Sequence, residues 1–320
     1  NNTAVGQGAL NDNTTGTQNT AVGSGALDAN TTASANVAVG NSALGVNTTG
    51  AQNNAVGVNA LDANTIGNYN NAFGTNALTS NTSGQFNTAV GESALGLNTV
   101  AANNTAVGYN SLVSNTTGTQ NVAVGASALD ANTTASNNTA VGYNSLGANT
   151  TGHSNTALGQ GTLALNTTGI YNTSVGKGAL FENTTANSNT ALGYDALALN
   201  TSGHSNVAVG AFSLDANTTA TQNTGVGVSS LSAVTTGSNN TGIGYQALKL
   251  VTTSTNNTAL GYQALENNTA SQNTAVGSDA LQANTNGDGN TAVGYQAVLS
   301  NTSGHNATGI GWNALRSNTT

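Results

Sequence analysis

Three histidines are the residues in this chain best suited to bind a metal or to shuttle a proton, and they occupy equivalent places in a repeat. His153, His204 and His305 each follow an Asn-Thr-Thr-Gly or Asn-Thr-Ser-Gly segment. If the repeats stack at the inter-strand spacing of about 4.8 Å, these histidines are separated by roughly 14 Å or more. Zinc holds its ligands at about 2 Å, so the spacing excludes a shared metal site. We expect all three histidines to lie on surface turns.

The acidic residues are scattered in the same way. Asp28, Asp62, Asp130 and Asp215 share one column of the repeat but do not fall in adjacent copies. No two carboxylates are therefore paired for acid–base chemistry. Glycine-containing stretches such as Gly6-Gln7-Gly8 recur with the repeat, and no phosphate-binding loop pattern follows them. We expect a protein that is not an enzyme and that uses no cofactor or metal.

The composition excludes further classes of function. Only 4% of the 320 residues are charged, the net charge is −8, and Lys177, Lys249 and Arg316 are the only lysines and arginines. Nucleic-acid binding needs a basic surface, and a membrane span needs about 18 consecutive apolar residues; the chain has neither. The absence of cysteine is compatible with an exported protein that needs no disulfides. Because the chain does not begin with Met, we expect a fragment of a longer fibre.

The whole chain is a tandem repeat with a period of 17 residues. Nineteen copies fill residues 1–320 as one repeat domain, and a single one-residue deletion falls in Asn268-Thr269-Ala270. An apolar column, here named the Val column, marks the period. Its members are Val5, Val22, Val39, Val56, Phe73, Val90, Val107, Val124, Val141, Leu158, Val175, Leu192, Val209, Val226, Ile243, Leu260, Val276, Val293 and Ile310.

Seventeen residues suit one coil of a parallel β-solenoid, in which each repeat lies on its copy in the next coil. We therefore predict an all-β fold of about nineteen coils. The column after the Val column, named the Gly column, is invariant from Gly6 to Gly311. Glycine fits a corner that needs a positive φ or a close backbone approach, so Gly108, Gly125 and Gly142 are predicted corner residues.

A second corner is predicted at the Asn-Thr-Thr segment, where Asn115 and Thr116 stand in the copy that spans residues 104–120. Stacked asparagines can form ladders of side-chain amides. The segment also matches the acceptor motif for N-glycosylation, at Asn115, Asn132 and Asn149 for example. We favour the structural role, because a corner asparagine explains the column without a glycan.

The strand of each coil is predicted at Thr-Ala-Val, as in Thr105-Ala106-Val107, where alternate side chains point to opposite faces. The residue between Thr and Val is never larger than Ala or Ser. A solvent-facing position would accept larger polar residues, so we expect this column to pack against another chain. The predicted assembly is a parallel homotrimer. The alternative is a monomer in which the alanines fill a narrow interior.

An aromatic column follows the Gly column and is a candidate for binding. Aromatic side chains here can stack on sugars of a cell-surface glycan or fill a groove between neighbouring chains, and we favour the groove. The members of this column are Tyr109, Tyr143, Tyr194, Tyr245, Tyr262, Tyr295 and Trp312.

The repeat resembles two families of fibrous proteins. Thr105-Ala106-Val107-Gly108 and Val122-Ala123-Val124-Gly125 are similar to the Ser-Val-Ala-Ile-Gly motif in the heads of trimeric autotransporter adhesins. Asn257 to Leu265 resembles repeats of phage tail fibres and bacterial surface proteins that often precede an endosialidase-type chaperone domain. The resemblance implies trimeric fibres of parallel β-coils, left-handed in the adhesin head. The adhesin coils are shorter, so the Asn-Thr-Thr-Gly segment is an addition that leaves the handedness open.

These observations predict a structural segment of an extracellular appendage, located on a cell surface or a virion, that acts as a stiff rod and supports attachment. One alternative is a filament subunit that polymerises end to end through the edge strands of its outer coils. Another is a solenoid whose surface binds ice or glycans. The invariant Thr of the Asn-Thr-Thr segment forms no Thr-X-Thr array of the kind that matches ice.

Overall fold

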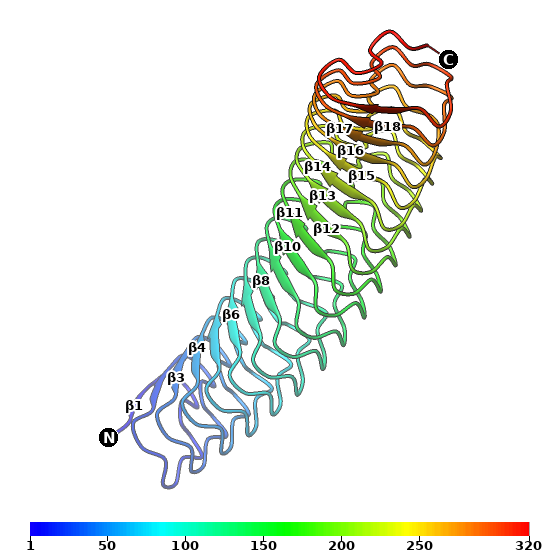
Figure 1. Ribbon diagram of the computed structural model, residues 1–320. Coiled ribbons are helices and arrows are strands. Elements are labelled where there is room, and N and C mark those ends of the chain that lie inside the picture. Colours follow the sequence, from blue (N-terminus) through cyan, green and yellow to red (C-terminus); the bar gives the residue numbers. More distant parts are fainter. Residues whose placement is uncertain (320) are drawn as a thin grey trace. The chain divides into compact units, whose positions relative to one another are not determined.

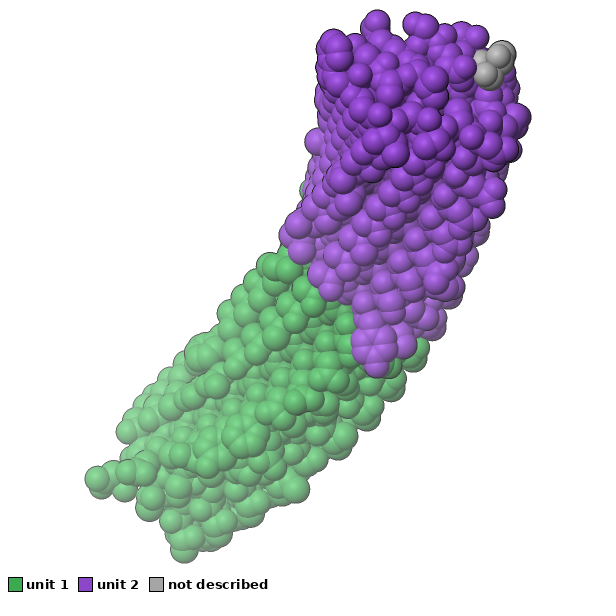
Figure 2. All heavy atoms as spheres, in the orientation of Figure 1, with its two compact units in different colours: residues 1–160 green, residues 161–320 purple. Residues whose placement is uncertain are grey.

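The computed structural model describes residues 1–319, and the chain divides into unit 1 (Asn1–Gln160) and unit 2 (Gly161–Thr320) (Figure 2). Each unit is a stack of coils, and each coil contributes one strand of three residues (Figure 1). The described residues contain strands, turns and bends but no helix.

The strands of unit 1 are β1 (Thr3–Val5), β2 (Thr20–Val22), β3 (Val37–Val39), β4 (Asn54–Val56), β5 (Asn71–Phe73), β6 (Thr88–Val90), β7 (Thr105–Val107), β8 (Val122–Val124), β9 (Thr139–Val141) and β10 (Thr156–Leu158). The strands of unit 2 are β11 (Thr173–Val175), β12 (Thr190–Leu192), β13 (Val207–Val209), β14 (Thr224–Val226), β15 (Thr241–Ile243), β16 (Thr258–Leu260), β17 (Thr274–Val276), β18 (Thr291–Val293) and β19 (Thr308–Ile310).

Within each unit, successive strands pair in parallel with equivalent residues side by side. Thr105, Ala106 and Val107 of β7, for example, pair with Val122, Ala123 and Val124 of β8. The same register holds between β11 and β12 in unit 2. The prediction of a parallel β-solenoid with one repeat per coil is confirmed.

Hydrogen bonds between coils continue around the turns. In unit 1, Leu112 N donates to Ala128 O at 2.9 Å, Thr116 N donates to Thr133 O at 2.9 Å, and Gly125 N donates to Val107 O at 2.7 Å. Nearly every part of the coil therefore needs a backbone N–H, and this explains why the chain contains no proline.

The interior of each unit is narrow and lined by small residues opposite one leucine per coil. The strand alanine Ala106 and the turn leucine Leu112 are both fully buried, as are their counterparts in the other inner coils. At Gly225, which replaces the strand alanine, an added Cβ would lie 2.6 Å from Ser213 Oγ and 3.4 Å from Leu214 Cδ1. The interior beside the strand therefore has no room for a side chain larger than a methyl group, and at Gly225 even a methyl group would require its neighbours to shift.

This arrangement corrects one interpretation of the sequence. The alanine column does not form contacts with another chain, because it already fills the interior of a single chain. The Val column, on the other side of the same strands, points outward. The alanines fill a narrow interior, because the coil is too thin to hold a second bulky residue beside leucine.

The one-residue deletion lies in a corner, as the sequence suggested. Asn268 Oδ1 accepts a hydrogen bond from Ala270 N at 3.4 Å, which closes the shortened corner. On the strand side the register survives, because Thr258 of β16 pairs with Thr274 of β17. The loop therefore absorbs the deletion and the strands do not shift.

Candidate functional site

The histidines lie on turns and are held by local contacts. His153 Nδ1 and His204 Nδ1 lie 3.2 and 3.3 Å from the hydroxyls of the serines that follow them. His305 Nδ1 accepts a hydrogen bond from Asp288 N at 3.1 Å and lies 3.9 Å from Asp288 Oδ2. Within residues 1–319, no group of three or more His, Cys, Asp or Glu side chains could hold a metal ion.

Three aspartates of the predicted acidic column are partly buried beside the leucine turn. Burial raises the pKa of the Asp62, Asp130 and Asp215 carboxyls above the ordinary value of 3.8. Backbone N–H groups partly offset this for Asp130 and Asp215, and the Asp195 carboxylate raises the pKa of Asp215 further. The four aspartates of the column remain in separate coils, so the structure does not bring them together as a catalytic pair.

The Gly column lies where the backbones of consecutive coils are in close contact. Gly108, Gly125 and Gly142 have φ angles of 133–135°. A Cβ on Gly108 would lie 2.6 Å from the carbonyl carbon of Gly125, and a Cβ on Gly125 would lie 2.5 Å from Gly142 O. Both the φ angle and the backbone contact exclude any side chain, which accounts for the invariant column.

The asparagine of the Asn-Thr-Thr segment forms a buried ladder. Asn115 Nδ2 donates to Asn98 Oδ1 at 3.1 Å and to Gly118 O at 3.0 Å, and Asn132 Nδ2 donates to Asn115 Oδ1 at 2.9 Å. The predicted amide ladder is confirmed. Because Asn115, Asn132 and Asn149 are fully buried with their amides engaged, the folded chain offers no glycosylation site at them.

The invariant Thr beside this ladder donates two hydrogen bonds to the next coil. Thr116 Oγ1 donates to Thr133 O at 3.0 Å, and Thr116 N donates to the same oxygen at 2.9 Å. A second buried asparagine column opens every repeat except the one that starts at Ala307, and it supports the opposite side of the corner. Asn121 N donates to Asn104 Oδ1 at 2.9 Å, and Asn121 Nδ2 donates to Ala135 O at 2.8 Å.

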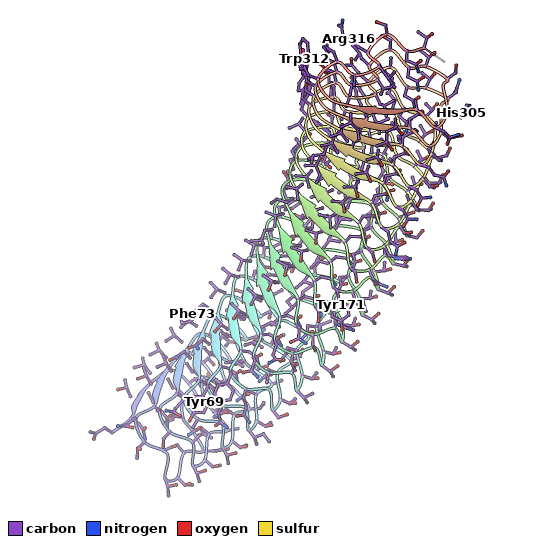
Figure 3. The ribbon with its side chains drawn as sticks, viewed as in Figure 1. Tyr69, Phe73, Tyr171, His305, Trp312 and Arg316 are labelled. Atoms are coloured by element: carbon purple, nitrogen blue, oxygen red, sulfur yellow. The ribbon has the colours of Figure 1, made fainter. Side chains whose placement is uncertain are left out.

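The outward face of the strands is the first candidate interaction surface. It carries the Val column together with the residue that opens each strand, which is Thr in most coils. Phe73 of β5 is 42% exposed and Leu192 of β12 is 47% exposed, and Figure 3 shows Phe73 projecting away from its strand. The sequence did contain a signal for this orientation, because the Val column accepts Phe and Leu whereas the alanine column accepts nothing larger than Ser.

The aromatic column is the second candidate surface, and all seven of its residues are exposed. Tyr245 and Tyr262 stack with ring centroids 5.5 Å apart and planes at 14°, and Tyr295 and Trp312 stack at 6.5 Å and 15°. Trp312 and His305 lie on different sides of the coil stack (Figure 3). The stacks join residues of one chain, so they need no partner chain to form.

Two further side-chain groups were not predicted from the sequence. Tyr69 and Phe86, in the column before the first asparagine, stack with centroids 4.9 Å apart. In unit 2, polar side chains accumulate beside the aromatic column: Gln282 Nε2 donates to Gln263 Oε1 at 3.2 Å and to Glu266 Oε2 at 3.0 Å. The signal was a run of glutamines at turn positions that hold Ser, Gly, Asn or Asp in most other coils.

Comparison with models of protein families and with curated proteins gave no match. In the part of the chain that the structure describes, no helix has the length and hydrophobicity needed to cross a membrane. The two exposed columns of the solenoid are the surfaces on which a function can be sought.

Proposed function

We propose that this chain is a structural segment of an extracellular fibre, in which parallel copies associate side by side through the Val column. The resulting assembly is a stiff rod that supports attachment at a cell surface or on a virion. The observation that carries the proposal is the outward position of one bulky apolar residue in every coil.

An exposed apolar row of this kind is unusual for a soluble monomer. Large contiguous apolar patches on a protein surface generally mark interaction sites. Here the row repeats on every strand of β1–β10 in unit 1 and of β11–β19 in unit 2, with Thr, Val or Asn as its neighbour on each strand. A partner with the same repeat would present the same row at the same spacing, which favours a second copy of this chain over an unrelated protein.

Three copies are favoured over two by the resemblance to adhesin heads. The motif Thr105-Ala106-Val107-Gly108 is the part of the coil that carries both the resemblance and the outward face. Association around a threefold axis would bury the Val columns against one another. The interaction would be hydrophobic and would require no charged residues, in agreement with the 4% charged composition.

The test is the mass of the purified chain in solution, measured by light scattering, with negative-stain images of the same sample. A uniform trimer of about three times 31.2 kDa is expected. In a variant with Val107→Lys, Val124→Lys and Val141→Lys, the trimer should dissociate, because three adjacent like charges would face each partner.

The matched control places the same charges on the exposed second Thr of three neighbouring corners, with Thr117→Lys, Thr134→Lys and Thr151→Lys. This variant should remain a trimer. A monomeric wild-type chain, or equal effects of the two variants, would contradict the proposal. Long polymers of uniform width would instead identify an end-to-end filament.

A second candidate function, ice binding, is favoured by the same outward face. On the strands, Thr occupies the column two residues before the Val column in 14 of 19 coils, and both columns point outward because strand residues alternate. Hydroxyl and methyl groups thus repeat at the regular inter-strand spacing of about 4.8 Å, as a match to ordered water requires. This array uses the strand threonines and not the corner threonines considered above.

Inhibition of ice recrystallisation tests the second candidate. If the face binds ice, a monomeric wild-type chain should inhibit crystal growth, and the Val107→Lys, Val124→Lys, Val141→Lys variant should not. If the face is buried between copies, the trimer should have no effect on ice. The two functions therefore exclude each other on this surface.

A further inference from the structure

Between Tyr245 and Trp312, the aromatic column of unit 2 is interrupted at a single coil. Tyr245 and Tyr262 precede the interruption, Ser278 occupies the column in the next coil, and Tyr295 and Trp312 follow. Backbone hydrogen bonds keep these coils in register, because Asp279 N donates to Tyr262 O at 2.9 Å and Gln296 N donates to Ser278 O at 2.9 Å. Ser278 therefore stands between two tyrosines that belong to the coils on either side. We name this place the Ser278 gap.

The aromatic stacks place one tyrosine on each side of the gap. Tyr245 stacks on Tyr262 with centroids 5.5 Å apart, and Trp312 lies nearly parallel to Tyr295 with centroids 6.5 Å apart. The stacked rings belong to consecutive coils, so rings that lie across the direction of stacking would turn their second faces toward the gap. Tyr262 and Tyr295 are the rings that border Ser278. Both tyrosines are exposed, at 50% and 45%.

The width of the gap selects the shape of its ligand. Two coil steps separate Tyr262 from Tyr295, which corresponds to about 10 Å. A ring inserted between them makes one van der Waals contact of about 3.5–4.0 Å on each side, or roughly 7–8 Å in total. A flat aromatic ring would be loose in this space, whereas the pucker and axial hydrogens of a pyranose ring would fill the remainder.

Polar side chains surround the gap in a pattern that suits sugar hydroxyls. Asp279 follows Ser278, and Gln263 and Gln296 occupy the equivalent turn positions of the flanking coils. Gln296 Nε2 donates to Asp279 Oδ2 at 3.4 Å, and Gln263 Oε1 accepts from Gln282 Nε2 at 3.2 Å. All of these side chains are half-buried, so their positions are restrained while part of each stays accessible.

Unit 1 contains a similar gap with shorter, uncharged polar side chains around it. Ala126 stands between Tyr109 and Tyr143, and the neighbouring turn residues are Asn110, Ser127 and Asn144. Its floor offers no hydroxyl and its neighbours have shorter side chains. The comparison separates the aromatic spacing, which both gaps share, from the hydrogen-bonding groups, which are concentrated at Ser278.

We propose that the Ser278 gap binds one pyranose unit of a saccharide between the faces of Tyr262 and Tyr295, with Ser278, Asp279, Gln263 and Gln296 bonding its hydroxyls. The site is independent of the proposed association between chains, because it lies beyond the Gly column and not on the strand face. Each copy of the chain carries its own complete site.

The test begins with the full chain on a printed array of bacterial, plant and animal glycans. The best-bound glycan is then titrated in solution while the fluorescence of Trp312, the only tryptophan, is followed. The decisive variant is Ser278→Tyr, which fills the gap with the aromatic residue most common in this column. It should fold normally, with an unchanged circular dichroism spectrum, and should lower the affinity at least tenfold.

Ala126→Tyr is the matched control, because it fills the gap of unit 1 and should leave the affinity unchanged. Ser278→Ala should weaken binding several-fold, since it keeps the space and removes one hydroxyl. The proposal is overturned if no glycan on the array binds, if Ser278→Tyr binds as well as the wild type, or if Ala126→Tyr abolishes binding. None of these variants alters the Val column, so the mass of the assembly tests the proposed association separately.

Discussion

At the scale of single residues, the solenoid depends on backbone conformations that most residues avoid. Leu112 and its counterparts adopt a left-handed conformation with φ near 50–56°, although leucine is rarely found there. The sharp turn directs the leucine side chain into the interior, where it is fully buried. A column of leucines does not indicate a left-handed backbone conformation, and the sequence therefore did not predict it. The Gly column was predictable, because only glycine combines a positive φ with a backbone contact.

The Gly column gives the first prediction. Gly91→Ala should lower the free energy of unfolding by about 3 kcal/mol, because a Cβ at φ 130° would lie 2.5 Å from Gly108 O. The control in the same coil is Gly96→Ala, where φ is negative and the nearest atom would lie 3.2 Å away. It should change the stability by less than about 1 kcal/mol. Thermal unfolding followed by circular dichroism compares the two, and equal losses would contradict this account.

The partly buried aspartates predict a dependence on pH. Burial raises the folded-state pKa of Asp62, Asp130 and Asp215 above 3.8, so the folded chain binds these protons more tightly than the unfolded chain. The free energy of unfolding should therefore rise as pH falls from 7 through the folded pKa values, and level off below about 3.8. Replacing all three by Asn, which occupies the equivalent place at Asn11, should remove most of this rise.

The control for this pH dependence removes the same charge from exposed sites, with Asp12→Asn, Glu92→Gln and Asp288→Asn. Unfolding midpoints of the two triple variants are compared between pH 7 and pH 4. If the control removes as much of the rise as the buried set does, the effect comes from the net charge of the chain and not from desolvation.

At the scale of elements, the corners are better specified by the sequence than the strands are. The columns of Asn115 and Thr116 pointed to a corner with an amide ladder, and the structure contains that ladder. The strand was placed correctly at Thr-Ala-Val, but its alanine face was assigned to a contact with another chain, whereas it lies in the interior. Alternation alone does not say which face is inside, and the usual preference for burying the larger apolar residue fails in a coil this thin.

An interruption of the ladder gives a prediction at this scale. Val234 and Val251 replace two ladder asparagines, and Asn217 Oδ1 is buried without a hydrogen-bond partner. Val234→Asn alone should change the free energy of unfolding little. The new amide would donate a hydrogen bond to Asn217 Oδ1, but its own side-chain oxygen would be left without a donor, because the next residue in the column is Val251. The double variant with Val251→Asn should complete the ladder to Asn268 and stabilise unit 2 by about 1–2 kcal/mol.

A double-mutant cycle of unfolding free energies measures this coupling. The gain in unfolding free energy of the double variant should exceed the sum of the two single changes. Additive effects would show that the unpaired oxygen of Asn217 carries no significant cost.

At the scale of the whole molecule, the repeat predicted the fold class, because every copy must satisfy the same contacts with the next coil. The surfaces were less predictable. The Ser278 gap and the outward Val column depend on which side chains leave the coil and in which direction, and a repeat pattern does not contain that information. Coil handedness stays a prediction from the resemblance to adhesin heads.

Single-site spin labels can test whether copies of the chain associate in parallel through the Val column. The chain has no cysteine, so Val39→Cys, Val124→Cys and, as a control on an exposed corner, Thr134→Cys can each be labelled alone. Electron–electron distances between chains should be short and equal at residues 39 and 124, and longer at 134. Unequal distances at the two Val-column sites, or no interchain distance at either, would contradict the account.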